Sequence, residues 1–156
     1  MLDSIVAIGD GGLLGIMLAV PMVLITVALH YEMLYWLSRN IPKMKFLHGR
    51  VRILAVILGA FTAHVIEIWL YGVAFYTLGE IAHVGSLEGE IVTNSFWEYL
   101  YFSTVSYTSL GVGDIFPSGA IRMLTGVEAL NGFVLITWSA SFAYLYMEKF
   151  WDLPKK

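Results

Sequence analysis

The chain contains no cysteine among its 156 residues, and it has few charged residues. The lack of cysteine excludes a metal site built from thiolates. Charged residues make up 13% of the chain, whereas soluble domains carry about 25%. Hydrophobic residues make up 58%, more apolar surface than a soluble domain of this size needs. The sequence therefore predicts a membrane protein.

Basic residues are scarce, and their positions say more than the formal net charge of −3. They are too few for a nucleic-acid-binding surface, so we expect no nucleic-acid partner. Eight of the nine lie in the 39–52 connection or beyond residue 148, and the positive-inside rule places both regions in the cytoplasm. The N-terminus and the Glu-rich segment 80–93 are then expected outside. The eight are Arg39, Lys43, Lys45, Arg50, Arg52, Lys149, Lys155 and Lys156.

Three apolar stretches are long enough to span a membrane, which takes about 20 helical residues. They cover residues 13–37, 53–78 and 121–150. The first is longer than a signal-peptide core and lacks a basic start, so we expect it to be retained. Pro21 is expected to kink it. Three transmembrane helices follow from this pattern.

A shorter helix is predicted between the second and third spans. Ser95 and Glu98 have the spacing of a capping box, in which Glu98 reaches back to the Ser95 N–H. A helix from there to about Ser106 is about 16 Å long, too short to cross a membrane. Its negative carbonyl end favours cations. We expect it to enter the membrane halfway.

The segment 104–114, after this helix, combines hydroxyl side chains with two glycines one residue apart, Gly111 and Gly113. Irregular backbone at membrane depth occurs only inside protein or beside water. Glycine adopts backbone angles that other residues avoid, so successive carbonyls can point the same way. A wall of carbonyls beside water is an ion site.

The run Ser109-Leu110-Gly111-Val112-Gly113-Asp114, preceded by Thr108, resembles the potassium-channel signature Thr-Val-Gly-Tyr-Gly-Asp. The Arg122–Gly132 segment, Arg-x-Leu-x-Gly-x-Glu-Ala-Leu-x-Gly, is similar to one in small bacterial two-pore-domain-like ion channels. The resemblance spans roughly residues 51–151. It implies a passive potassium channel whose filter is formed by four subunits. The residues it implies as ion ligands are Thr108, Ser109, Leu110, Gly111, Val112 and Gly113.

The resemblance also assigns supporting roles and an alternative. It implies that Asp114 braces the filter by a hydrogen bond behind it. Val112 stands where the family has Tyr, which removes an aromatic brace. A nonselective monovalent cation channel is therefore the alternative.

The expected fold is an all-α membrane protein with three transmembrane helices, a re-entrant pore helix and a filter loop, assembled as a potassium-channel-like homotetramer. Residues 1–50 form an extra helix and a basic cytoplasmic connection, and residues 51–156 form the pore domain. The first helix has no counterpart in a two-span pore, so we expect it at the periphery. We expect a bacterial inner membrane location, lipid contact and no partner protein.

Two acids, Glu67 and Glu128, lie within spans, where a charge costs about 2.5–3.5 kcal/mol or more. Counted from the outer ends, they share one level. They form a proton-sensitive ring near the filter, or they are neutral, hydrogen-bonded carboxyls that support the short helix. Both readings stay open.

A metal site is the basis of an alternative of another class, a membrane-embedded metalloenzyme. His64-x-x-Glu67 reverses the usual Glu-x-x-His spacing. His30 and Glu32 are expected near the inner interface, far from Glu67. We therefore expect neither enzymatic activity nor a cofactor apart from the permeant ion. The candidate ligands are His30, Glu32, His64, Glu67 and Glu128.

Two glycines, Gly126 and Gly132, interrupt the third span. Glycine inside a helix costs up to about 1 kcal/mol, so it needs a reason. Potassium channels place an inner-helix hinge close to the position of Gly132. Close helix packing is an equally good reason.

Overall fold

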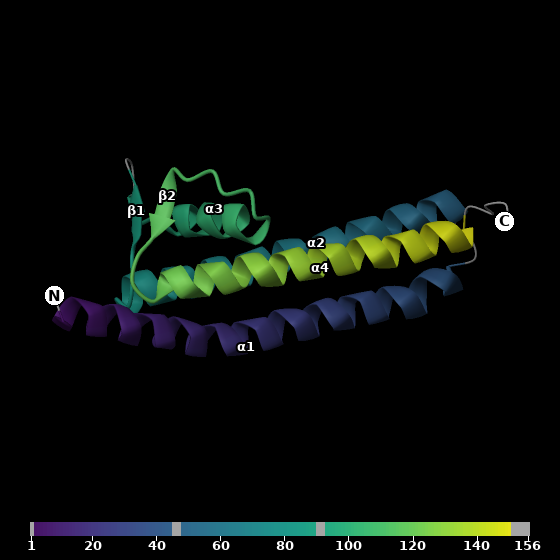
Figure 1. The fold of residues 1–156 in the computed structure, drawn as a ribbon. Helices are drawn as coiled ribbons and strands as arrows, with labels where there is room; N and C mark the ends of the chain where they lie inside the picture. The colour runs from purple at the N-terminus through teal and green to yellow at the C-terminus, as the bar shows by residue number, and fades with distance from the viewer. Residues whose placement is uncertain (1, 45–47, 90–92, 151–156) are drawn as a thin grey trace.

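A computed structural model describes residues 2–44, 48–89 and 93–150 of the chain, with side chains from residue 12 onward. Lys45, Glu90 and the tail residues Lys155 and Lys156 lie outside these ranges. The described part is mostly helical, and three long helices lie side by side (Figure 1). The predicted fold class, a helical membrane protein with a short inserted helix, is confirmed.

The three long helices are α1 (Leu2–Asn40), α2 (Gly49–Tyr76) and α4 (Ile121–Phe150). Each contains a segment long and apolar enough to cross a membrane. The segment 121–150 is α4 as predicted, whereas α1 starts well before residue 13. Pro21 lies inside α1, which Figure 1 shows as one curved, unbroken helix.

Between α2 and α4 the chain forms a small layer at one end of the bundle. A π-helical turn, Thr77–Ile81, follows α2 and leads to β1 (Leu87–Gly89). The short helix α3 (Phe96–Tyr107) comes next, followed by a loop and β2 (Ile115–Pro117). β1 and β2 pair antiparallel, with Glu88 opposite Phe116. This pair of strands, β1 and β2, is called the hairpin, although α3 lies between them in the chain. It holds the two ends of the segment that contains α3 together.

The segment from β1 to β2 is re-entrant. In Figure 1, α3 runs from the hairpin toward the middle of the bundle, and the loop after it returns to β2. With 12 residues, α3 is about 18 Å long, less than the membrane thickness. The predicted half-membrane helix is therefore present.

The basic connection after α1 and the basic end of α4 lie at the same end of the bundle. The N-terminus and the hairpin lie at one end in Figure 1, and the end of α4 lies at the other. The start of α2 is also at that second end, because a Cβ on Gly49 would lie 2.8 Å from the Phe150 carbonyl oxygen. The basic connection and the basic end of α4 thus share one end.

Helix α1 and helix α3 pack on opposite sides of the α2–α4 pair (Figure 1). Leu37 of α1 contacts the backbone of α2 at Gly59. Toward the other end, Gly15 packs so closely that a Cβ would overlap the carbonyl oxygen of Ala120 before α4. Helix α1 thus covers the side of the α2–α4 pair that α3 does not contact.

Candidate functional site: a re-entrant loop and the polar network behind it

Helix α3 begins at Ser95, the predicted N-cap, whose backbone is extended. The predicted capping box differs in its partner: Ser95 makes no side-chain capping bond, and the Glu98 carboxylate accepts hydrogen bonds from the N–H and hydroxyl of Thr93. Asn94, with φ 56°, turns the chain so that Thr93 faces the helix. These hydrogen bonds, with the Thr93 hydroxyl first, lower the pKa of Glu98.

Glycines on two helices bring α3 close to the bundle. A Cβ on Gly72 of α2 would lie 3.2 Å from the Cα of Leu100. A Cβ on Gly132 of α4 would overlap the backbone oxygen of Tyr107, the last residue of α3. Side chains at these positions would push α3 outward, so the glycines set its depth.

This contact supports the packing reading of Gly132, and a hinge at Gly132 stays a prediction. Its place against Tyr107 shows that packing requires a glycine there. At Gly126 a Cβ would meet nothing within 4 Å among the described residues, so packing within the chain does not explain it. Its role as a hinge stays a prediction.

The loop after α3 alternates its backbone conformation. Ser109, Gly111 and Gly113 have φ values of 56°, 60° and 82°, in the left-handed region. The unusual backbone angles predicted at the two glycines are therefore confirmed. Ser109 takes such an angle without being glycine, and strain of this kind concentrates at functional sites. The residues between them, Leu110 and Val112, are 69% and 55% exposed.

Asp114 ties the end of this loop to α3. Its Oδ2 accepts a hydrogen bond of 2.9 Å from the Tyr101 hydroxyl, and its Oδ1 accepts one from the N–H of Ile115. The first of these is a hydrogen bond behind the loop, as the resemblance implies for this residue. The loop is thus fixed at both ends, by Tyr107 and by Asp114.

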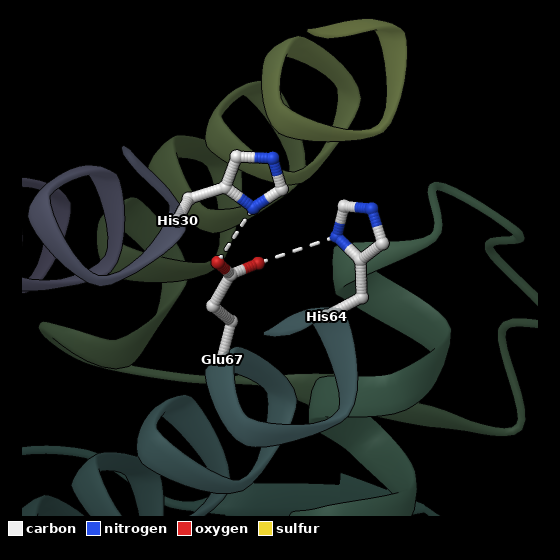
Figure 2. Close-up of side chains that lie close together, drawn as sticks. All are labelled: His30, His64 and Glu67. Atoms are coloured by element: carbon white, nitrogen blue, oxygen red, sulfur yellow. Dashed lines mark hydrogen bonds and ion pairs between the residues drawn. The ribbon is translucent and has the colours of Figure 1, made fainter. Parts of the chain in front are cut away.

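Behind α3, Glu67 lies fully buried between two histidines (Figure 2). His30 Nδ1 is 2.9 Å from Glu67 Oε1, and His64 Nδ1 is 3.3 Å from Oε2. The Tyr107 hydroxyl donates a short hydrogen bond to Oε2. Glu67 thereby joins α1, α2 and the end of α3.

The prediction that His30 lies far from Glu67 is wrong, because α1 and α2 are offset along their axes. Leu37 is level with Gly59, not with the first turn of α2. Seven residues back from Leu37 is His30, and eight residues on from Gly59 is Glu67, about two turns in both cases. Glu32, by contrast, is exposed and lies outside this group.

Glu128 forms a second buried site. Its Oε1 is 2.6 Å from the Ser103 hydroxyl of α3, which is also 2.9 Å from the carbonyl oxygen of Ile68. Because Ile68 follows Glu67, the two acids are at one level, as predicted. Ser103 has one proton for two oxygen partners, so both contacts are satisfied when Glu128 carries a proton and donates to Ser103.

The other Glu128 oxygen, Oε2, has no hydrogen-bond partner among the described residues. An ionised carboxylate would leave that charge unpaired in the membrane interior. The geometry therefore favours the reading in which Glu128 is neutral and supports α3 by its hydrogen bond to Ser103.

Sequence reasoning missed Thr26 of α1, and it considered His30 only as a metal ligand far from Glu67. The Asn131 amide donates to Thr26, at 2.8 Å, and to the Tyr71 hydroxyl, at 3.3 Å. Thr26 and His30 are both fully buried. Their i, i+4 spacing in an apolar span was the available signal, since polar residues there face the bundle interior.

A family model described as an ion channel matches residues 53–149, which hold α3, the loop and both helices against which α3 packs. No curated protein and no solved structure matches the chain. The match covers more than half of the chain and excludes all of α1. The chain is an integral membrane protein that belongs to the ion channel family, as the motif around Gly111 and Gly113 predicted.

Proposed function

We propose that this ion channel conducts potassium passively, through a filter to which each of four subunits contributes Ser109–Gly113. The observation that carries the proposal is the alternating left-handed backbone at Ser109, Gly111 and Gly113. An alternating backbone lets carbonyls line one side of the loop, where they replace the water shell of a cation. Thr108 and the Ser109 hydroxyl add oxygen ligands at its inner end.

The exposure of the loop supports assembly around a shared axis. Residues 108–114 are all exposed in the single chain. Their backbone cannot face lipid without unsatisfied polar groups, so water or other protein must surround it. A ring of four copies supplies both, because each loop then faces a central water-filled path.

Charge supports cation conduction and an orientation. The carbonyl end of α3 points along the bundle toward the middle of its length, and its partial negative charge favours cations. With the basic connection in the cytoplasm, the N-terminus and the hairpin lie outside. The proposed setting is a bacterial inner membrane, across which ions move down their electrochemical gradient without a catalytic step.

Flux measurements on proteoliposomes test the proposal. We expect potassium flux that barium blocks, and we expect no comparable flux of sodium. The purified assembly is expected to have the mass of four chains. Empty liposomes are the control. An assembly of one or two chains, or no cation flux above empty liposomes, would contradict the proposed pore.

A nonselective cation channel remains a second candidate, because Val112 replaces the aromatic residue of the family signature. Bi-ionic reversal potentials separate the two, with a potassium-over-sodium permeability ratio near one for the nonselective case. The variant Val112→Tyr is expected to raise that ratio by restoring an aromatic brace. An unchanged ratio in the variant would show that the brace does not control selectivity.

A further inference from the structure

His30, His64 and Glu67 bring three metal-ligand side chains to one point inside the bundle, with ligand atoms within 4.8 Å of one another. Figure 2 shows both imidazoles directing Nδ1 at the carboxylate. His30 comes from α1, outside the segment that matches the ion channel family. The function proposed above uses none of these groups as an ion ligand.

The far sides of the two imidazoles meet a single hydroxyl. Ser139 Oγ of α4 is 3.1 Å from His30 Nε2 and 3.1 Å from His64 Nε2. The ring centroids of the two histidines are 5.0 Å apart. One carboxylate and one hydroxyl therefore contact all four imidazole nitrogens.

When Glu67 is ionised and both histidines are neutral, these contacts are one proton short. Each Nδ1 then carries its proton toward the carboxylate, which leaves both Nε2 atoms as acceptors. Ser139 has one proton and can donate to only one of them. Either one added proton or a bound cation completes the contacts.

A divalent metal ion completes the same contacts. With a metal on both Nδ1 atoms and on Glu67, each imidazole carries its proton on Nε2 and donates it to Ser139 Oγ, which accepts two hydrogen bonds. Metal-ligating histidines commonly donate their other N–H to such an outer partner. The ion also compensates the buried carboxylate.

We propose that His30, His64 and Glu67 bind a divalent transition-metal ion of the zinc class. Two imidazoles and one carboxylate are a usual ligand set for zinc, whose tetrahedral ligand atoms lie about 3.3 Å apart. The pairs at 2.9 and 3.3 Å are already near that spacing, and side-chain rotation closes the rest. The Tyr107 hydroxyl, 2.9 Å from His64 Nδ1, is placed as the fourth ligand or as a donor to Glu67.

His64 is the most accessible of the three ligand residues. Its side chain is 14% exposed, whereas the His30 and Glu67 side chains are fully buried. His64 and Tyr107 also line a pocket of about 460 Å³ between α2 and α3. Tyr107 is the last residue of α3 and directly precedes the filter loop. A bound metal ion would therefore link α1, through His30, to the start of that loop.

Metal titration of the purified full chain tests the site. After chelator treatment, Zn²⁺ is expected to bind at one ion per chain and to raise the thermal unfolding temperature. Co²⁺ is expected to give the intense visible absorption of a four-coordinate site. His30→Gln is expected to abolish both signals, and Ser139→Ala to weaken binding about 10–100-fold. His48→Gln, at the exposed start of α2, is the matched control and should bind normally.

The outcomes are separate from ion conduction. Wild-type protein that binds neither ion, or His30→Gln protein that binds as wild type does, overturns the proposal. If an extra proton and not a metal ion completes the hydrogen bonds of His30, His64 and Glu67, the wild-type protein binds neither ion. A chain that binds one Zn²⁺ per subunit but conducts no potassium supports the metal site and contradicts only the proposed function.

Discussion

At the scale of single residues, Gly111 has a backbone conformation that favours glycine. Its φ of 60° is one that L-residues rarely adopt, and a Cβ there would meet nothing within 4 Å in the described chain. The requirement for glycine is therefore conformational and not steric.

The variant Gly111→Ala is accordingly expected to insert and assemble but not to conduct. A side chain in the left-handed region costs about 1–2 kcal/mol, and in the proposed tetramer four subunits would repeat that cost at one filter. The loop is expected to relieve this strain by turning the residue 111 carbonyl away from the ion path. That change should lower potassium flux more than about 100-fold. Proteoliposome flux measures this, with chromatographic elution as the check on assembly. Conduction at the wild-type level would refute the filter assignment.

Glu98 gives a prediction for pH. Its lowered folded-state pKa means that the stabilisation by Thr93 is fully present above the ordinary value of 4.5, and is lost as the pH falls through the lowered value. The difference in unfolding temperature between wild type and Glu98→Gln should be constant above pH 4.5 and shrink below it. A difference independent of pH would show that the carboxylate charge contributes nothing.

At the scale of elements, the glycine contact between α3 and α4 predicts a difference between two similar substitutions. Gly132→Ala places a methyl group against the Tyr107 carbonyl and should destabilise each subunit by about 1–3 kcal/mol. Gly126→Ala fills open space in the same helix and should stabilise by up to about 1 kcal/mol. Thermal unfolding of both variants measures the difference. Equal effects would show that α3 does not depend on this contact.

The elements that the sequence predicted well are those with a local cause. Hydropathy placed the long helices, and Ser95 marked the start of α3. The β1–β2 hairpin was missed because its two three-residue strands are paired by a distant contact and carry no alternation of their own. The His30–Glu67 contact was missed for a similar reason: it depends on the offset between α1 and α2, which no local pattern reveals.

At the scale of the whole molecule, the lack of cysteine makes orientation directly measurable. A membrane-impermeant thiol reagent applied from outside should label Glu88→Cys, on the hairpin, and not Arg50→Cys, at the start of α2. Both positions are exposed in the structure. The unsubstituted chain supplies a control without thiols. The reverse labelling pattern would place the basic connection outside and contradict the proposed topology.

The contact between the added helix and the pore has a consequence for any attempt to shorten the chain. Removing residues 1–40 leaves a segment with the familiar two-helix layout, yet it strips His30 and Thr26 from partners in the remaining helices. Glu67 would lose one imidazole and Asn131 one hydroxyl, both in the apolar interior. A minimal pore cut from this channel would therefore need a replacement partner for Glu67 and another for Asn131.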